Sequence, residues 1–325
     1  MRLSICIATY RRAGMIGATL DSILPGLTDD VELLVVDGAS PDETEAVVAG
    51  RFQGRANCRY LRLAAKGGVD RDYCIAVEQA YGDYVWLMTD DDALKPGAVA
   101  RVLAALAGEP DLVVVNAEVA DADLGRTLLD RKLRLAADRT VAPGQRDELL
   151  ALTGDLLTFI GSVVVRRETW QARDKESWVG TEFVHVGVIF QAPLGRPARV
   201  IAEPLVRIRY GLAQWAGRAF EIWMFNWPKL IWGLAGIGEA AKAAVTPREP
   251  WRHTGRLLTM KAQGHYTLAA YRRWLAPLPM PRTHRLGAWL LAVWPRSLFV
   301  LQMRLVVPLL PPHEREMMKF ELSRH

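Results

Sequence analysis

The sequence predicts an α/β protein in which a parallel sheet is flanked by helices and followed by a helical C-terminal region. Two observations lead to this class. Over residues 1–210, short apolar runs rich in β-branched residues alternate with segments whose apolar residues recur at helical spacing, an order that builds parallel sheets. From residue 211 onwards the pattern is helical, rich in tryptophan and basic residues, and broken by prolines, so we expect short helices there.

The first elements alternate between strand and helix. LSICIAT at residues 3–9 is a short, mostly apolar segment and predicts a buried strand, and GMIGATLDSIL at 14–24 has apolar residues at helical spacing. VELLVVDGAS at 31–40 predicts a second strand that runs into a turn, because Asp-Gly is a common turn pair. A helix is expected to follow through residues 41–52.

The same alternation continues beyond this helix. CRYLRLA at 58–64 predicts a third strand, RDYCIAVEQAY at 71–81 a helix, and DYVWLMT at 83–89 a fourth strand. PGAVARVLAAL at 96–106 predicts a helix that has proline in its first turn, and DLVVVNAEV at 111–119 resumes the sheet. Pieces of both kinds continue to the strand-like segment ARVIAEPLVRIRYG.

The two parts of the chain differ in charge. Residues 1–205 carry 23 Lys and Arg against 30 Asp and Glu, a net charge of −7, whereas residues 206–325 carry 18 against 6, a net charge of +12. The second part also holds 8 of the 11 tryptophans. We therefore expect two domains of different chemistry, 1–210 and 211–325.

Cysteine usage and the N-terminus indicate a cytosolic chain. Cys6, Cys58 and Cys74 show no zinc-binding spacing and lie in or beside apolar runs, as reduced thiols do. Met1-Arg2 leads straight into LSICIATY, which is too short and too β-branched for a signal peptide. The longest weakly charged stretch, 286–303, has Pro-Arg at its centre, which argues against a transmembrane helix.

Polar residues follow four of the predicted strands. They are Thr9 to Arg12, Asp37 to Ser40, Lys66 to Asp72, and Thr89 to Asp92. Ligands of open α/β sheets collect outside the carboxyl ends of the strands, so we expect these segments to share one edge.

Each segment allows two interpretations. The triplet Asp90 to Asp92 is either a solvated turn or an oxygen-ligand site for Mg²⁺ or Mn²⁺, in which a cation would relieve the repulsion between the carboxylates. Asp37 either caps a turn or accepts a hydrogen bond from a nucleotide base. Lys66-Gly67-Gly68, with Arg71, is either a plain loop or a phosphate-binding segment.

Taken together, these motifs resemble the nucleotide-binding half of family 2 glycosyltransferases, which have the GT-A fold. ICIATYRR, ELLVVDGASPDETE and KGGVDRDYCIAVEQAYGDYVWLMTDDDALKPGAV occur in the family's order, and the chain is most similar to bacterial O-antigen sugar transferases of the abequosyltransferase type. The resemblance covers residues 1–210. It implies a Rossmann-like, mixed, mostly parallel sheet and inverting transfer of a hexosyl or deoxyhexosyl group from a nucleotide diphosphate-sugar.

The resemblance also implies roles for single residues. Those expected to hold the nucleotide and its diphosphate are Thr9, Tyr10, Arg11, Asp37, Asp70 and Arg71, and Lys66 joins them as the candidate phosphate partner in its own loop. The triplet corresponds to the family's DxD motif. Asp92, with Asp90, would bind Mn²⁺ or Mg²⁺, and either Asp90 or Asp91 would contact the ribose or sugar. Thr89 departs from the pattern, because many relatives have an aspartate at its position.

Inverting transfer needs a base that lies beyond the metal motif in the sequence. Within SWVGTEFVHVGVIFQA, Glu182 is the first candidate, and His185 is a second candidate or an additional metal ligand. Many relatives have a Glu-Asp pair at this position, which this chain lacks. Asp155 is a weaker rival. Arg207 and Arg209 either reach the diphosphate or simply lie on the solvent-exposed face of a strand.

The tail suits helices that lie on a membrane, since tryptophan rings occupy the headgroup level and basic side chains meet anionic lipid. The alternative is a helical domain that packs these aromatics in its own core. Nucleic acid is not expected as a partner, because the basic residues are interspersed with aliphatic runs and no binding module is recognisable.

We therefore expect a peripheral enzyme on the cytoplasmic face of the bacterial inner membrane. It would use a polyprenyl-diphosphate-linked saccharide as acceptor in the synthesis of an O-antigen-like cell-surface polysaccharide. A nucleotidyltransferase is a second hypothesis, although TYRRAGMIG is a poor match to the glycine-rich phosphate loop of that class. A catalytically silent membrane scaffold is a third.

Overall fold

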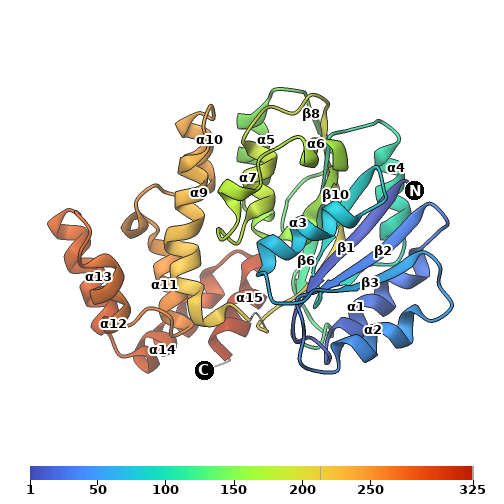
Figure 1. Ribbon diagram of the computed structural model, residues 1–325. Coiled ribbons are helices and arrows are strands. Elements are labelled where there is room, and N and C mark those ends of the chain that lie inside the picture. The colour runs from blue at the N-terminus through green and yellow to red at the C-terminus, as the bar shows by residue number, and fades with distance from the viewer. Residues whose placement is uncertain (213, 324–325) are drawn as a thin grey trace. The chain divides into compact units, whose positions relative to one another are not determined.

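The computed structural model describes residues 1–212 and 214–323, which form two compact units (Figure 1). Unit 1 comprises Met1–Tyr210 and Leu234–Ile237, and unit 2 comprises Gly211–Gly233 and the chain from Gly238 onwards. Each unit has its own buried core and is described separately below.

Unit 1 is built on one sheet. Its strands are β1 (Leu3–Thr9), β2 (Val31–Asp37), β3 (Cys58–Arg62), β4 (Tyr84–Met88), β5 (Ala93–Leu94), β6 (Leu112–Ala120), β7 (Thr127–Leu129), β8 (Arg139–Val141), β9 (Val163–Arg166) and β10 (Ala198–Arg209). Their order is β3-β2-β1-β4-β9-β6-β10-β5, with β7 beside β6 and β8 beside β10.

The central strands run parallel. β1 pairs in parallel with both β2 and β4, β2 with β3, and β6 with β10, while β9 lies antiparallel between β4 and β6. Every residue of β2, β4 and β6 is buried, as expected of strands covered on both faces. The predicted α/β class with a mixed, mostly parallel sheet is confirmed.

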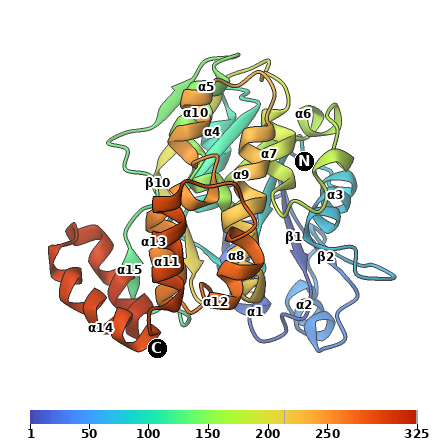
Figure 2. The same cartoon turned by 90° about the vertical axis from the view of Figure 1, so that its left-hand side faces the viewer.

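Helices flank this sheet on both faces. They are α1 (Ile16–Ile23), α2 (Thr44–Phe52), α3 (Val69–Gln79), α4 (Ala98–Leu106), α5 (Arg146–Thr153), α6 (Arg167–Gln171) and α7 (Val184–Phe190). α1 packs against α2, and α3 packs on β1 and β2 (Figures 1 and 2). The chain passes from β1 to β3 in one direction and returns to β4 in the other, so right-handed crossovers put α3 on the face opposite α1 and α2.

Unit 2 is helical. Its α-helices are α8 (Ala219–Glu221), α9 (Trp227–Gly233), α10 (Glu239–Val245), α11 (Thr254–Ala262), α12 (Leu268–Ala270), α13 (Arg282–Val293), α14 (Arg296–Val306) and α15 (Pro312–Ser323). One buried cluster includes Phe220, Met260 and Tyr266, and the rings of Phe220 and Tyr266 stack with centroids 5.4 Å apart. A second cluster includes Phe299, Val300 and Leu322. The predicted short helices are therefore present.

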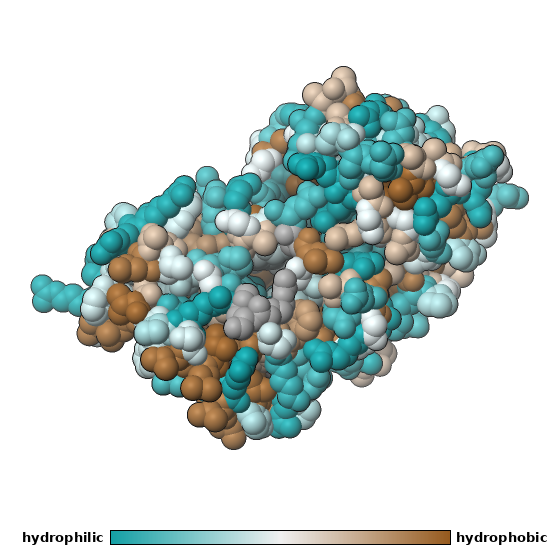
Figure 3. Space-filling model, turned by 90° about the horizontal axis from the view of Figure 1, so that it is seen from below, coloured by the Kyte–Doolittle hydropathy of each residue, from teal (hydrophilic) through white to brown (hydrophobic). Residues whose placement is uncertain are grey.

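Some apolar side chains of unit 2 remain outside these clusters. On α13, Leu286, Trp289, Leu290 and Val293 are exposed, and on α14 and just beyond it the exposed fractions reach 75% at Leu305 and 82% at Leu309. Hydrophobic side chains gather over the C-terminal helices on the face seen in Figure 3.

None of the described helices alone has the length and apolar composition of a membrane span. The two consecutive helical segments Arg282–Val293 and Arg296–Leu309 reach that length and apolar composition only when taken together, and the chain bends by 104° between them.

Candidate active site

Three parallel strands end side by side at one edge of the sheet. Thr9, the last residue of β1, pairs with Asp37, the last residue of β2, and Ile7 pairs with Met88 at the end of β4. β2 lies on one side of β1 and β4 on the other, which makes the gap between β1 and β4 a topological switch point. Open α/β sheets bind ligands at this kind of position.

Asp37 organises the turn that follows β2. Its side chain is fully buried, and its Oδ1 accepts a 2.8 Å hydrogen bond from the backbone N–H of Ser40. Its Oδ2 accepts a hydrogen bond from the Tyr60 hydroxyl and lies 3.5 Å from the Arg62 guanidinium. The Ser40 hydroxyl in turn accepts a 2.9 Å hydrogen bond from the Arg11 N–H, so the turns after β1 and β2 are joined.

Asp72, for which the sequence pattern predicts no role, lies directly beside this turn. Its side chain is only 3% exposed and is enclosed by two glycines. A Cβ at Gly38 would approach its Oδ2 to 2.9 Å, and a Cβ at Gly67 would approach its Oδ1 to 2.7 Å. Burial raises the pKa of Asp72 to about 6, and the like charge of Asp37 adds to the effect. The glycines that follow β2 and β3 were the available signal for this close approach.

Arg12 bridges the switch point between β1 and β4. Its Nε lies 3.4 Å from Asp90 Oδ1, and its terminal nitrogen lies 3.1 Å from Asp91 Oδ2. The three side chains are 11%, 13% and 16% exposed, so this is a largely buried ion-pair cluster. Burial and the neighbouring charge of Asp91 raise the pKa of Asp90 to about 7. The basic residue that partners the triplet was not singled out from the sequence.

Asp92 has different partners from its two neighbours. It is 3% exposed, its Oδ1 accepts a 2.6 Å hydrogen bond from the Arg209 N–H, and its Oδ2 accepts a hydrogen bond from the Thr89 hydroxyl. Arg209 also donates from its Nε to the Asp91 carbonyl at 2.7 Å. Thr89, which departs from the family pattern, therefore fixes the turn that presents Asp90 and Asp91.

Asp70 holds the segment that contains Glu182. Its Oδ2 accepts 2.8 Å hydrogen bonds from the N–H groups of Gly180 and Glu182, and its Oδ1 accepts one of 3.2 Å from Val184. Glu182 has a positive φ of 69°, a conformation uncommon for residues other than glycine. Asp70 is buried, and these three hydrogen bonds attach its side chain directly to the loop. The structure thus joins two predicted site residues through the backbone.

His185 points into the core of unit 1. It is 1% exposed, and its Nε2 lies 2.7 Å from the carbonyl oxygen of Leu157. Burial lowers its pKa to about 4, which makes the neutral imidazole the stable form. Its ring is 6.5 Å from that of Phe183, measured between centroids.

The other predicted basic residues have protein partners. Arg71 pairs with Glu176, with 2.7 Å between one nitrogen and Oε2, and Arg207 Nε lies 2.7 Å from Glu118. Lys66 Nζ lies 4.0 Å from the ring centroid of Tyr10, so these two candidates are in contact. Asp155 lies 3.1 Å from Lys132 on the surface.

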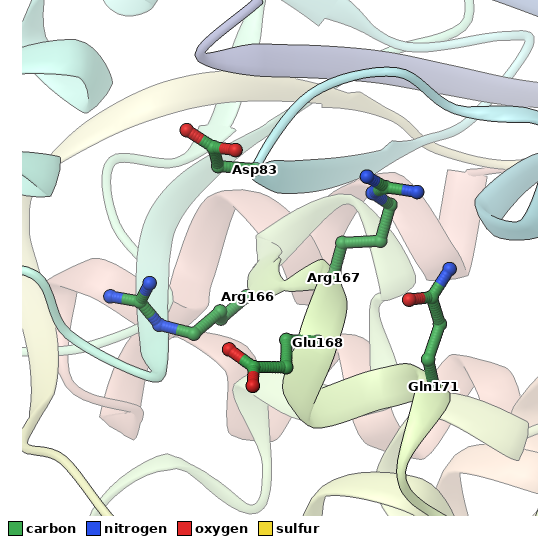
Figure 4. A pocket seen from close by; sticks show the side chains of 5 residues that line it. All are labelled: Asp83, Arg166, Arg167, Glu168 and Gln171. Atoms are coloured by element: carbon green, nitrogen blue, oxygen red, sulfur yellow. The ribbon is translucent and has the colours of Figure 1, made fainter.

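A small pocket lies away from this edge. It has a volume of about 130 Å³ and is lined by Asp83, Arg166, Arg167, Glu168 and Gln171 (Figure 4). Asp83 directly precedes β4, so this pocket lies near the amino end of that strand, whereas the triplet follows its carboxyl end. It therefore does not belong to the candidate active site.

Within residues 1–212 and 214–323, no three His, Cys, Asp or Glu side chains form a preassembled metal centre. The convergence of Asp90 and Asp91 on one cationic group nevertheless fits the needs of Mg²⁺ or Mn²⁺. Such ions take one or two carboxylates and complete their shell with phosphate oxygens and water.

Together, the mixed sheet and the acidic edge define the GT-A class of glycosyltransferases. The chain belongs to glycosyl transferase family 2, whose model matches residues 4–169, just over half of the sequence. The family resemblance noted from the sequence is thereby confirmed, and the protein is a glycosyltransferase.

Two relatives of known activity are similar to this chain over part of its length. The abequosyltransferase RfbV of Salmonella typhimurium is 29% identical over an alignment of 223 residues, and the alignment covers 64% of this chain and 67% of that protein. The GalNAc(5)-diNAcBac-PP-undecaprenol beta-1,3-glucosyltransferase of Campylobacter jejuni is 28% identical over 103 residues, which are 31% of this chain and 33% of that protein.

Solved structures share the fold along nearly the whole chain. Residues 1–349 of S. aureus TarS in complex with UDP-GlcNAc give a TM-score of 0.59 at 17% identity, covering 99% of this chain and 90% of that one. The mannosyltransferase PcManGT of Pyrobaculum calidifontis, in complex with GDP-Man and Mn²⁺, gives 0.56 at 14% identity, covering 99% and 86%.

Proposed function

We propose that this glycosyltransferase moves a hexosyl or deoxyhexosyl group, with inversion, from a nucleotide diphosphate-sugar to a polyprenyl-diphosphate-linked saccharide in bacterial O-antigen-like polysaccharide synthesis. The observation that carries the proposal is the acidic edge at the ends of β1, β2 and β4 in a family 2 chain. Two further facts support it: the structural neighbours bind UDP-GlcNAc and GDP-Man, and the name of the C. jejuni relative specifies a PP-undecaprenol substrate.

The donor would lie across the switch point. Its base would meet the segment formed by Tyr10, Asp37 and Asp72, and its diphosphate would lie toward Asp90 and Asp91. Mn²⁺ or Mg²⁺ bound there would neutralise the charge that develops on the leaving nucleoside diphosphate. We assign Asp90 and Asp91 as the carboxylates that face the cation, with Asp92 as the residue that fixes their turn, because its own two oxygens already accept hydrogen bonds.

Glu182 is the residue we propose as general base. It would take the proton of the acceptor hydroxyl as that oxygen attacks the anomeric carbon. Its partial exposure and the three hydrogen bonds that hold its loop on Asp70 support this assignment over His185, which is buried. We also leave His185 out of the metal site, because its Nε2 is already bonded to a backbone carbonyl.

Unit 2 would place the enzyme on the cytoplasmic face of the inner membrane as a peripheral protein. Residues 250–313 contain nine Lys and Arg and no Asp or Glu. The exposed side chains of α13, at positions 286, 289, 290 and 293, form one apolar stripe at helical spacing. A cavity of about 300 Å³ beside this stripe is lined by Tyr271, Arg282, Arg285, Leu286 and Trp289. Basic and apolar groups together suit an anionic bilayer surface.

Two measurements on the full chain test the proposed function. A thermal-shift screen of UDP, GDP, CDP and their sugars, with and without Mn²⁺, should reveal one nucleotide that raises the melting temperature, and Mn²⁺ should increase the effect. Glu182→Gln should bind that nucleotide as the wild type does but lose roughly 10²–10⁴-fold in transfer rate. An unchanged transfer rate would rule out Glu182 as the base, and stabilisation by no nucleotide would contradict the proposed donor class.

A further inference from the structure

The position of Arg12 has a consequence for how the cation and the donor bind. Its guanidinium lies within 3.4 Å of Asp90 and 3.1 Å of Asp91, the two carboxylates proposed above to face the metal. The Arg12 side chain is 11% exposed, so it has little access to water as an alternative partner. The cationic position between β1 and β4 is therefore filled by the protein itself.

A guanidinium and a divalent cation compete for these two carboxylates, since Arg12 already contacts Asp90 Oδ1 and Asp91 Oδ2. The two cations would repel each other at short range in a poorly solvated site, where charges interact more strongly than in water. Moving Arg12 away without giving it another anion would leave a largely buried charge unpaired, which is strongly unfavourable. Binding of the metal alone should therefore be opposed by Arg12.

A diphosphate removes this obstacle. Arginine presents several N–H groups in a planar fork that matches phosphate oxygens, so the diphosphate of the donor can replace the two carboxylates as its partner. Asp90 and Asp91 would then be able to hold the metal, while Arg12 would donate to the phosphate oxygens. Each ligand favours the binding of the other.

We propose that Arg12 is the internal counter-ion of the Asp90–Asp91 pair and that it transfers from this pair to the donor diphosphate when metal and donor bind together. The inference rests on the proposed function, because it takes the metal and the nucleotide diphosphate as ligands. Arg12 is thus assigned as a donor-binding residue that couples the two affinities. Coupling of this kind is reciprocal.

The test measures Mn²⁺ binding to the full-length protein by the loss of the free-ion electron paramagnetic resonance signal. With Mn²⁺ alone, Arg12→Gln should bind the ion roughly tenfold more tightly than the wild type, within the usual range of coupling effects. When the nucleoside diphosphate found in the thermal-shift screen is also present, the wild type should bind Mn²⁺ more tightly than Arg12→Gln, because the variant has lost a partner for the phosphates. Binding of the nucleoside diphosphate alone should also weaken in Arg12→Gln.

Two further variants make the result specific. Arg12→Lys keeps the charge but not the planar fork, so it should still oppose Mn²⁺ alone while binding the nucleoside diphosphate less tightly than the wild type. Arg51→Gln removes a surface arginine of the same unit, whose Nε lies 2.9 Å from Asp21, and should leave both affinities unchanged. Circular dichroism establishes that each variant is folded.

The outcomes separate the inference from the proposed function. If Arg12→Gln bound Mn²⁺ alone no more tightly than the wild type, while both bound it with the nucleotide, Arg12 would not be the counter-ion and the metal-dependent function would stand. If neither protein bound Mn²⁺ with any nucleoside diphosphate, the proposed metal dependence would fail, and the inference with it.

Discussion

The carboxylates at the sheet edge of unit 1 differ in what surrounds them, and this difference divides their roles. Asp37 and Asp92 are buried; Asp37 accepts a hydrogen bond from the Ser40 N–H in the turn after β2, and Asp92 accepts one from the Arg209 N–H at the end of β10. Asp90 and Asp91 are largely but not fully buried, and both face one guanidinium. The first pair therefore shapes the backbone at this end of the sheet, and the second pair is the one we propose to face a cation that replaces Arg12.

Asp72 gives a prediction about stability. Its pKa in the folded protein is about 6, above the ordinary value of 3.8, so folding favours its protonated form. The stability it contributes is present below pH 4 and is lost as the pH rises through 6, because the buried group must then ionise. Asp72→Asn should therefore be more stable than the wild type at pH 7.5, on the order of 2 kcal/mol, and equal to it near pH 3.5.

Urea denaturation at the two pH values measures this difference. Asp42→Asn is a suitable control. Burial acts to raise the pKa of the exposed Asp42, but hydrogen bonds from the Thr44 hydroxyl and from backbone N–H groups together outweigh it, so the pKa of Asp42 is lowered where that of Asp72 is raised. Asp42→Asn should be less stable than the wild type at pH 7.5, because it loses an ionised carboxylate that stabilises the fold. A destabilised Asp72→Asn at that pH would show that the ionised carboxylate has a stabilising partner.

At the scale of elements, the strands and the helices between them could be predicted, because parallel strands buried on both faces leave continuous apolar runs. β5 has only two residues and leaves no pattern, and the four residues of β9 are too few to show a period. The sequence predicted which residues follow the carboxyl ends of the strands and therefore lie at the candidate site. It did not predict their interaction partners, because Arg12 pairs with Asp91, and Asp70 accepts a hydrogen bond from Gly180, across long stretches of sequence.

The link between Asp70 and the loop before α7 gives a prediction at this scale. The family resemblance puts Asp70 over the nucleotide, whereas the structure shows its oxygens accepting three N–H groups from residues 180–184. Asp70→Asn replaces one acceptor oxygen with a donor group, so the loop should loosen. We expect a fall of roughly tenfold or more in the transfer rate, because Glu182 would be misplaced, with little change in nucleotide affinity.

Faster hydrogen exchange at residues 180–184 in Asp70→Asn would confirm the loosened loop. Glu78→Gln, an exposed change on the same helix, should leave both exchange and transfer unaltered. A loss of nucleotide affinity with unchanged exchange would instead support direct contact between Asp70 and the donor.

At the scale of the whole molecule, the chain joins two kinds of surface. Unit 1 offers an acidic edge that suits a metal and a diphosphate, and unit 2 offers exposed apolar helices in a segment without acidic residues. A water-soluble donor and a lipid-linked acceptor would require both, since one arrives from solution and the other stays at a bilayer. The opposite charges of the two parts of the chain are consistent with this division of labour.

The apolar stripe on α13 yields the last prediction. Trp289→Glu and Leu290→Glu, made together, place two charges where the side chains are 42% and 46% exposed, so folding should be largely unaffected. Binding to phosphatidylglycerol vesicles should fall at least tenfold, because each change removes apolar area and adds repulsion from the anionic surface. Leu258→Glu changes a side chain on α11 that is 39% exposed, and it should reduce vesicle binding much less. Sedimentation with the vesicles at low and high salt measures this, and equal losses in the two proteins would show that α13 is not the membrane-contacting helix.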